Sequence, residues 1–239
     1  MSIKHQVKLN VWITIPSPEL FEIMLQESEF DTVTIDIQHG LIDISDVRKM
    51  LTISQLSDKP VYVRIPSHDK TIIGKMLDYG ACGIICPDVN TAEEAKQVVS
   101  AMLYPPDGNR SFGPLRAKVK PEEANMVFMI ESLIGVRNLT DILSVKGLSS
   151  ILVGPIDLWI SLYGNTNIQW DDKAFIETLQ EIANQSLEKN IPCGIVIVSE
   201  SPIDISKKMI SMGYTLITPI IDSIFIKSSI KNLATKIKT

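Results

Sequence analysis

The chain has 239 residues, 45% apolar and 21% charged, with a formal net charge of −5. This composition is typical of a globular domain with a sizeable core and excludes a largely disordered chain. The acidic balance disfavours nucleic acid and membrane surfaces as partners. The first residues also lack the apolar core of a signal peptide, so we expect a cytosolic protein that acts on a small molecule.

Apolar runs of strand length recur eight times and alternate with segments of helical spacing. The runs are Leu9 to Ile15, Thr32 to Ile37, Val61 to Ile65, Gly83 to Pro87, Met126 to Ile130, Ser150 to Val153, Cys193 to Val198, and Thr215 to Pro219. The helical spacing is clear at Leu20, Ile23 and Met24, and at Phe175, Leu179, Ile182 and Leu187. Continuously apolar runs are typical of strands that are buried on both faces of a parallel sheet.

This alternation predicts an α/β fold, a single (β/α)8 TIM barrel that occupies residues 1–239 as one domain. A doubly wound open sheet is the main alternative. It commonly carries a glycine-rich turn after its first strand, and Ile15-Pro16-Ser17-Pro18 has no glycine. The long irregular stretch from Tyr104 to Pro121 is expected to be a functional loop, because structureless segments of this length are uncommon in compact domains.

Two carboxylates follow consecutive strands of the predicted barrel, where active-site residues lie. Glu131 follows the fifth run and Asp157 the sixth. Neighbouring parallel strands lie about 4.8 Å apart, so both carboxylates can face one cation. Two carboxylates with open positions suit a hard divalent ion such as Mg²⁺ or Mn²⁺. The structural alternative is that each carboxylate only caps the helix that it opens.

Candidate substrate-binding groups lie beside this predicted metal site. The segment Gly154-Pro155-Ile156-Asp157 opens a helix, and free backbone N–H groups at a helix start bind a carboxylate well. Arg64 ends the third run, and its fixed positive charge can stabilise an enolate oxygen. The alternative for Arg64 is a structural ion pair at the rim of the barrel.

A candidate acid–base pair follows the second run. Asp36 precedes His39 by three residues, a spacing that lets the carboxylate orient the imidazole in a tight strand-to-helix turn. Such a pair is a common device of general acid–base catalysis. A lone histidine is more often structural, so this spacing alone leaves both roles open.

Several segments together resemble the HpcH/HpaI aldolase family, metal-dependent class II aldolases that act on 2-keto acids such as pyruvate. They are Ile35-Asp36-Ile37-Gln38-His39-Gly40, Val63-Arg64-Ile65-Pro66, Tyr104-Pro105-Pro106, Arg110-Ser111-Phe112-Gly113-Pro114-Leu115-Arg116-Ala117, Ile130-Glu131, and Val153-Gly154-Pro155-Ile156-Asp157-Leu158. The resemblance extends from about Val11 to about Ile221, and the shared order of the segments makes it specific.

The resemblance implies the same site residues. Glu131 and Asp157 would be metal ligands, Arg64 the contact to the substrate carbonyl and enolate, and His39 with Asp36 the acid–base pair. It also implies a homo-oligomer. The chain departs from the family pattern at Met129, where many members carry glutamine, and in the stretch from 116 to 126, which is shorter than usual.

Alternative functions differ in how well the residues support them. A subgroup that the chain also resembles condenses oxaloacetate with acetyl-CoA to citrate for siderophore biosynthesis, and the same residues serve either reaction. A Schiff-base aldolase needs a buried lysine, and the run from Ser150 to Val153 has none. A non-catalytic barrel that serves as a binding protein remains an alternative, because fold does not guarantee function.

Overall fold

The eight predicted strands form one closed parallel barrel. The structure is a computed structural model that describes residues 6–27, 29–199 and 201–238. Its strands are β1 (Lys8–Ile13), β2 (Thr32–Asp36), β3 (Val61–Arg64), β4 (Gly83–Cys86), β5 (Asn125–Ile130), β6 (Ser150–Val153), β7 (Cys193–Val196) and β8 (Leu216–Ile221). They pair in sequence order, and β8 closes onto β1. The predicted (β/α)8 fold is therefore confirmed.

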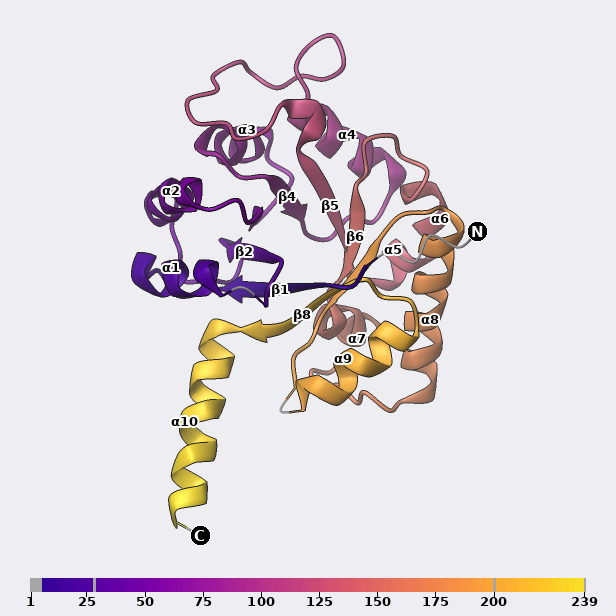
Figure 1. Cartoon of the computed structure of the whole chain (residues 1–239). Helices are drawn as coiled ribbons and strands as arrows, with labels where there is room; N and C mark the ends of the chain where they lie inside the picture. Colours follow the sequence, from indigo (N-terminus) through magenta and orange to yellow (C-terminus); the bar gives the residue numbers. More distant parts are fainter. Residues whose placement is uncertain (1–5, 28, 200, 239) are drawn as a thin grey trace.

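Helices follow the strands and surround the barrel (Figure 1). They are α1 (Pro18–Gln26), α2 (Ile44–Ile53), α3 (Lys70–Tyr79), α4 (Ala92–Met102), α5 (Leu133–Arg137), α6 (Leu139–Ile142), α7 (Pro155–Tyr163), α8 (Lys173–Glu188), α9 (Pro202–Ser211) and α10 (Asp222–Lys238), with short 3-10 turns η1 (Ser54–Leu56) and η2 (Pro121–Glu123). Several of these helices begin where a side chain next to the first turn caps the backbone. Asp43 and Thr91 each form a capping box, which satisfies backbone N–H groups at the first turn.

The buried faces of two helices differ in detail from the sequence prediction. In α1 the buried residues are Phe21 and Leu25, whereas Ile23 is 64% exposed. In α8 Phe175, Leu179 and Ile182 are buried as predicted, and Leu187 is exposed. Apolar spacing identified the helices correctly but did not fix which of two adjacent apolar positions faces the sheet.

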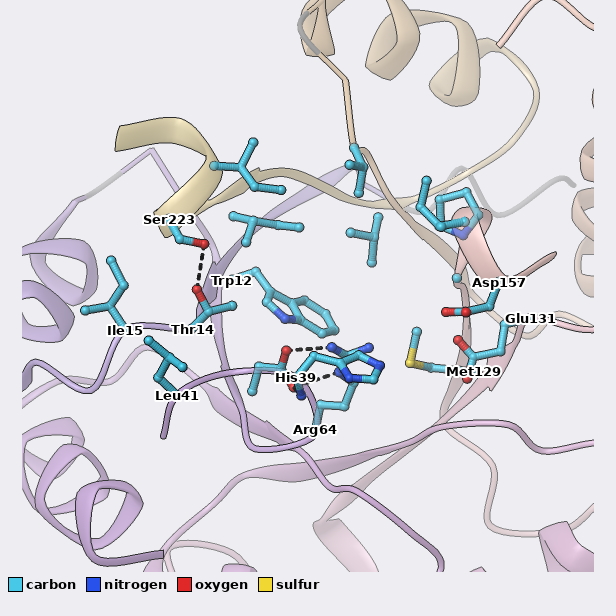
Figure 2. A pocket seen from close by; sticks show the side chains of 18 residues that line it. Trp12, Thr14, Ile15, His39, Leu41, Arg64, Met129, Glu131, Asp157 and Ser223 are labelled. Carbon is cyan, nitrogen blue, oxygen red and sulfur yellow. Dashed lines mark hydrogen bonds and ion pairs between the residues drawn. The ribbon is translucent and has the colours of Figure 1, made fainter. Parts of the chain in front are cut away.

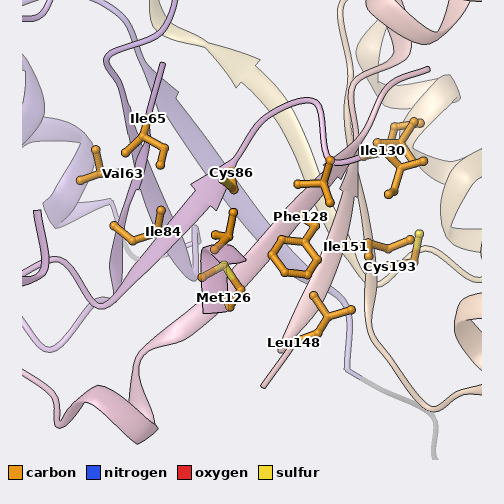
Figure 3. Close-up of a cluster of buried hydrophobic side chains, with 14 of the residues drawn as sticks. Val63, Ile65, Ile84, Cys86, Met126, Phe128, Ile130, Leu148, Ile151 and Cys193 are labelled. Atoms are coloured by element: carbon orange, nitrogen blue, oxygen red, sulfur yellow. The ribbon is translucent and has the colours of Figure 1, made fainter. Parts of the chain in front are cut away.

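Alternate residues of each strand face two different apolar layers. Outward-facing side chains such as Val63, Ile84, Phe128 and Ile151 pack beneath the helices (Figure 3). The inward-facing set fills the barrel and comprises Trp12, Ile85, Val127, Met129, Leu152 and Val196. Burial on both faces explains why the strands appear in the sequence as continuous apolar runs.

Two segments extend beyond the barrel. The stretch between α4 and η2 forms a loop beside α3, where the Arg110 guanidinium bonds Asp78 Oδ1 at 2.5 Å. Helix α10 continues from β8 and extends away from the barrel (Figure 1). Across the described residues, none of the helices has the length and apolar character that a membrane crossing needs. Cytosolic location and the single-domain boundary stay predictions.

Candidate active site

One pocket collects all the predicted site residues at the carboxyl ends of the strands. It has a volume of about 410 Å³. The predicted residues that line it are Asp36, His39, Arg64, Glu131, Gly154, Pro155, Ile156 and Asp157. The loop from Tyr104 to Pro121 contributes none of the lining residues described for this chain, and its expected function stays a prediction.

Arg64 is held by Asp36 on the adjacent strand. The two residues are register partners of β2 and β3, and both are buried, Arg64 to 8% exposure and Asp36 to 1%. Arg64 donates from Nε to Asp36 Oδ1 at 2.9 Å and from Nη2 to Oδ2 at 2.5 Å. This two-point contact fixes the plane of the guanidinium before any ligand binds.

The ion pair determines the charge state of Asp36. Burial, the largest influence, raises the pKa of this carboxyl, but the Arg64 guanidinium, Trp12 and the Gln38 backbone N–H together lower it further. The net result is a pKa of Asp36 below its ordinary value. Asp36 is therefore a permanent anion at neutral pH, a state suited to positioning and unsuited to proton transfer.

His39 enters the pocket from the turn after β2. Asp36 Oδ1 accepts from the backbone N–H of Gln38 at 3.0 Å and of His39 at 3.3 Å. A Cβ on Gly40 would lie 2.2 Å from the Asp36 carbonyl oxygen, so this turn needs glycine. Within the described ranges the imidazole makes no hydrogen bond. Asp36 thus orients the His39 backbone and the Arg64 guanidinium, whereas the sequence prediction had it orient the imidazole.

Glu131 lies at the end of β5 with one carboxylate oxygen left open. Its Oε1 accepts from the Asp88 backbone N–H at 2.7 Å, and its buried Oε2 has no hydrogen-bond partner in the described part of the chain. Asp88 has φ of 49°, a left-handed conformation that turns this N–H toward Glu131. A Cβ on Gly154 would lie 2.3 Å from Oε2, so glycine leaves room for the carboxylate.

Burial, the largest influence, raises the pKa of Glu131 to about 7. The negative charges of Asp157 and Asp88 add to this rise, while the Asp88 N–H and Arg64 oppose it. Glu131 and Asp157 lie at the same end of the pocket (Figure 2). The two carboxylates repel each other, and one buried oxygen of Glu131 has no hydrogen-bond partner in the described part of the chain. This end of the pocket therefore has an excess of negative charge.

These two carboxylates fit a divalent cation. Each offers hard oxygen donors, and Glu131 Oε2 has an open lone pair in the protein as it stands. No group of three or more His, Cys, Asp or Glu that could hold a metal occurs in residues 6–27, 29–199 and 201–238. A cation here would therefore take its remaining ligands from water or substrate, as Mg²⁺ commonly does.

The start of α7 presents backbone donors to the same pocket. Gly154 is the N-cap, Pro155 occupies the first turn, and the cap carries no side-chain hydrogen bond. The N–H groups of Ile156 and Asp157 lie in this first turn, where no intrahelical acceptor exists. Together with the helix dipole they can bind a carboxylate, and substrate binding by this segment stays a prediction.

Comparison with known proteins identifies the family. The family model of HpcH/HpaI aldolase/citrate lyase matches residues 8–204. This chain belongs to that family. A hydroxypyruvate/pyruvate aldolase from Rhizorhabdus wittichii is 38% identical over 160 residues, which span 63% of each protein. A 5-keto-4-deoxy-D-glucarate aldolase from Salmonella paratyphi A is 29% identical over 98% of this chain and 93% of its own.

Among solved structures, the citrate synthase SbnG superposes on this HpcH/HpaI family member with a TM-score of 0.84. It is 27% identical, and the alignment covers 99% of this chain and 98% of that one. The family comprises enzymes of the aldolase and lyase type, so the predicted enzyme class and the resemblance are both confirmed.

The sequence analysis missed three residues of this family member, one that lines the pocket and two that bond lining residues. Trp12 faces the barrel interior, and the Arg64 guanidinium carbon lies 4.9 Å from its ring centroid. Asp88 follows β4 by two residues, a signal that a survey of all strand ends would have caught. Asp222 directly follows β8 as the first residue of α10, and its buried carboxylate accepts from the Thr14 and Ile15 backbone N–H groups, which anchors the chain after β1.

Proposed function

We propose that this enzyme makes or breaks a carbon–carbon bond of a 2-keto acid, pyruvate or oxaloacetate, through an enolate. The observation that carries the proposal is the Arg64 guanidinium, which Asp36 holds in place in the same pocket as the open Glu131 oxygen. A fixed cation that needs no reorganisation stabilises developing negative charge strongly in a site screened from water.

A divalent cation, Mg²⁺ or Mn²⁺, would be held by Glu131 and Asp157. When bound, it would supply positive charge that polarises the keto group and makes the adjacent C–H more acidic. The raised pKa of Glu131 supports this assignment, because a buried carboxylate near a second one is stabilised as an anion by a cation.

The remaining residues divide the work on the substrate. The N–H groups of Ile156 and Asp157 at the start of α7 bind the substrate carboxylate. Arg64 contacts the keto oxygen, which becomes the enolate oxygen. His39 moves the proton, a role supported by an imidazole that lines the pocket and has no competing partner among the described residues.

Citrate formation from oxaloacetate and acetyl-CoA, with a place in siderophore biosynthesis, is the second candidate. It is favoured by the alignment with SbnG over nearly the full length of both chains. Both reactions pass through an enolate, so the same residues would serve. Incubation with oxaloacetate and acetyl-CoA, assayed for citrate, against pyruvate and an aldehyde, assayed for the hydroxy-keto acid, distinguishes the two.

We also propose that the protein is a homo-oligomer. Helix α10 exposes a series of apolar side chains, namely Ile224, Phe225, Ile226, Ile230, Leu233 and Ile237. An extended apolar helix surface of this kind is typical of a protein contact. Sedimentation of the wild type against an Ile230→Glu, Leu233→Glu variant tests this, and an unchanged mass would contradict α10 as the contact.

Proton exchange at C3 of pyruvate in D₂O isolates enolisation from the carbon–carbon step. We expect exchange that requires Mg²⁺ or Mn²⁺ and stops with a chelator. Arg64→Lys keeps the charge but loses the planar fork, so exchange should fall on the order of 10²-fold, and Arg64→Ala should lose more. If Arg64→Ala, verified as folded by circular dichroism, exchanged protons at the wild-type rate, Arg64 would be a structural residue and the proposal would fail.

A further inference from the structure

The pocket has one charged side and one apolar side. Glu131 and Asp157 lie at one end, whereas Ile15 and Leu41 lie at the other, with His39 and Arg64 between them (Figure 2). Apolar residues also lie beside the carboxylates, where Met129 neighbours Glu131, but the end with Ile15 and Leu41 has no charged side chain among the described lining residues. A substrate whose keto acid group lies near the carboxylates must therefore direct its other end toward apolar side chains of the pocket.

The hydroxyl groups on the apolar side are already engaged. Thr14 Oγ1 bonds Asp222 Oδ1 at 2.5 Å and Ser223 Oγ at 2.8 Å. Asp222 also accepts from the backbone N–H of Ser223 at 2.7 Å. A substrate rich in hydroxyl groups would lose its hydrogen bonds to water without gaining equivalent ones, which costs free energy.

Positive charge is also lacking on that side. Arg64 is the one lysine or arginine among the residues described as lining the pocket, and Asp36 already binds its Nε and Nη2. The acidic side chains of the lining are the carboxyl groups of Asp36, Glu131 and Asp157. A second carboxylate on the substrate would contact apolar side chains or other carboxylates. An unpaired buried charge of this kind is strongly disfavoured.

We propose that the acceptor of this enzyme is an aldehyde with an uncharged, apolar substituent, an alkyl or aryl group; this rests on the proposed aldolase function. In the synthetic direction C3 of pyruvate loses a proton and bonds the aldehyde carbon, and the aldehyde oxygen gains a proton. The product is a 4-hydroxy-2-keto acid, so atoms and charge balance. The substituent packs at the end of the pocket formed by Ile15 and Leu41, where apolar surface is removed from water.

Two aldehydes of the same shape provide the test. They are 4-methylpentanal and 4-oxobutanoate, which differ by an isopropyl group in place of a carboxylate. With pyruvate and Mg²⁺, we expect kcat/KM for 4-methylpentanal to exceed that for 4-oxobutanoate by about tenfold or more, as a site without a matching group rejects a charge. The hydroxy-keto acid product is measured directly by mass spectrometry.

A charge introduced on the apolar side should change this selectivity. Leu41→Arg places a guanidinium at the mouth, where Leu41 is 81% exposed, so the fold should tolerate it. We expect the selectivity ratio to move toward 4-oxobutanoate. Leu56→Arg is the matched control, because Leu56 is exposed in η1 and does not line the pocket, and its ratio should equal that of the wild type.

The outcomes separate the inference from the function on which it rests. Proton exchange at C3 of pyruvate with equal or better use of 4-oxobutanoate would overturn the apolar acceptor and leave the proposed function intact. An unmoved ratio in Leu41→Arg would also count against it. Absence of proton exchange with either metal would overturn the proposed function, and the acceptor assignment would fall with it.

Discussion

The interior of the barrel contains polar groups at both ends, and the two ends differ in whether these groups have hydrogen-bond partners. At the amino-terminal end Asn10 accepts from Thr32 at 2.9 Å and from Thr34 at 3.1 Å, and donates to Thr218 at 3.0 Å. This cluster is buried and its members bond one another. At the carboxyl end, buried Glu131 Oε2 has no such partner within the described ranges.

The difference distinguishes structural from functional polar groups. A buried polar group whose hydrogen bonds are all made stabilises one arrangement of the core. Its hydrogen bonds to other protein groups offset the cost of removing it from water. A group left open costs stability, and it is retained where a ligand completes it. Substitutions at the carboxyl end should therefore remove activity, and substitutions at the amino-terminal end should remove stability.

The largest effect on activity is expected at the carboxylate pair. Glu131→Gln keeps the shape of the side chain and removes one of the two proposed anionic metal ligands, so Mn²⁺ binding by titration calorimetry should be undetectable at concentrations that saturate the wild type. Glu122→Gln removes an exposed carboxylate outside the pocket and is the charge-matched control. Equal Mn²⁺ affinity in Glu131→Gln would show that this carboxylate is not a ligand.

A somewhat smaller loss is expected at His39. His39→Ala should lower kcat by about 10² to 10⁴-fold, because a positioned acid–base group contributes that much, while Mn²⁺ affinity stays near the wild-type value. Added imidazole should restore part of the exchange at C3 of pyruvate. Near-normal turnover in the variant would return His39 to a structural role.

The sequence was sufficient to predict the fold, and the residues that it proposed for the site do line one pocket. Continuous apolar runs identified the strands, and the topology of a barrel then brings residues such as Arg64 and Glu131 to one rim. It was insufficient for pairwise contacts. Asp36 is three residues from His39 and 28 from Arg64, yet it bonds the Arg64 side chain, since the register of β2 and β3 sets them side by side.

Trp12 shows the same limit. An indole in an apolar run predicts burial, but only the closed barrel shows that it faces inward beneath the Arg64 guanidinium. The open side of Glu131 also depends on long-range structure, because it requires Asp88 from β4 and the absence of a side chain at Gly154.

The pair of Asp36 and Arg64 connects the two kinds of polar group, because its two side chains bond each other at two points and still line the pocket. Asp36→Asn leaves a buried guanidinium without its counter-charge, which should cost about 3–5 kcal/mol of stability. The pKa of Asp36 is lowered in the folded state, so its contribution is complete above the unfolded value of about 3.9 and is lost as the pH falls further.

Urea unfolding of wild type and Asp36→Asn across this range measures the effect. The gap between their free energies of unfolding should be constant between pH 6 and 8. It should narrow below about pH 4, because Asp36 of the unfolded wild type then takes up a proton while the lowered pKa of the folded protein keeps the carboxylate ionised. A gap that does not depend on pH would mean that the charge of Asp36 contributes nothing to stability.

The smallest effect is expected at the amino-terminal end, and it should fall on stability alone. Thr218→Val keeps the shape of a buried side chain but removes the oxygen that accepts from Asn10 Nδ2. A buried donor left unsatisfied costs about 1–3 kcal/mol, so the midpoint of urea unfolding should fall accordingly. Thr166→Val is the control, because Thr166 is exposed, and its effect should stay within about 0.5 kcal/mol.

Proton exchange at C3 of pyruvate should keep its wild-type rate in Thr218→Val at a temperature where both proteins are folded. A large loss of exchange without a loss of stability would show that the bonded cluster takes part in the chemistry, and the division of polar groups between the two ends would not hold.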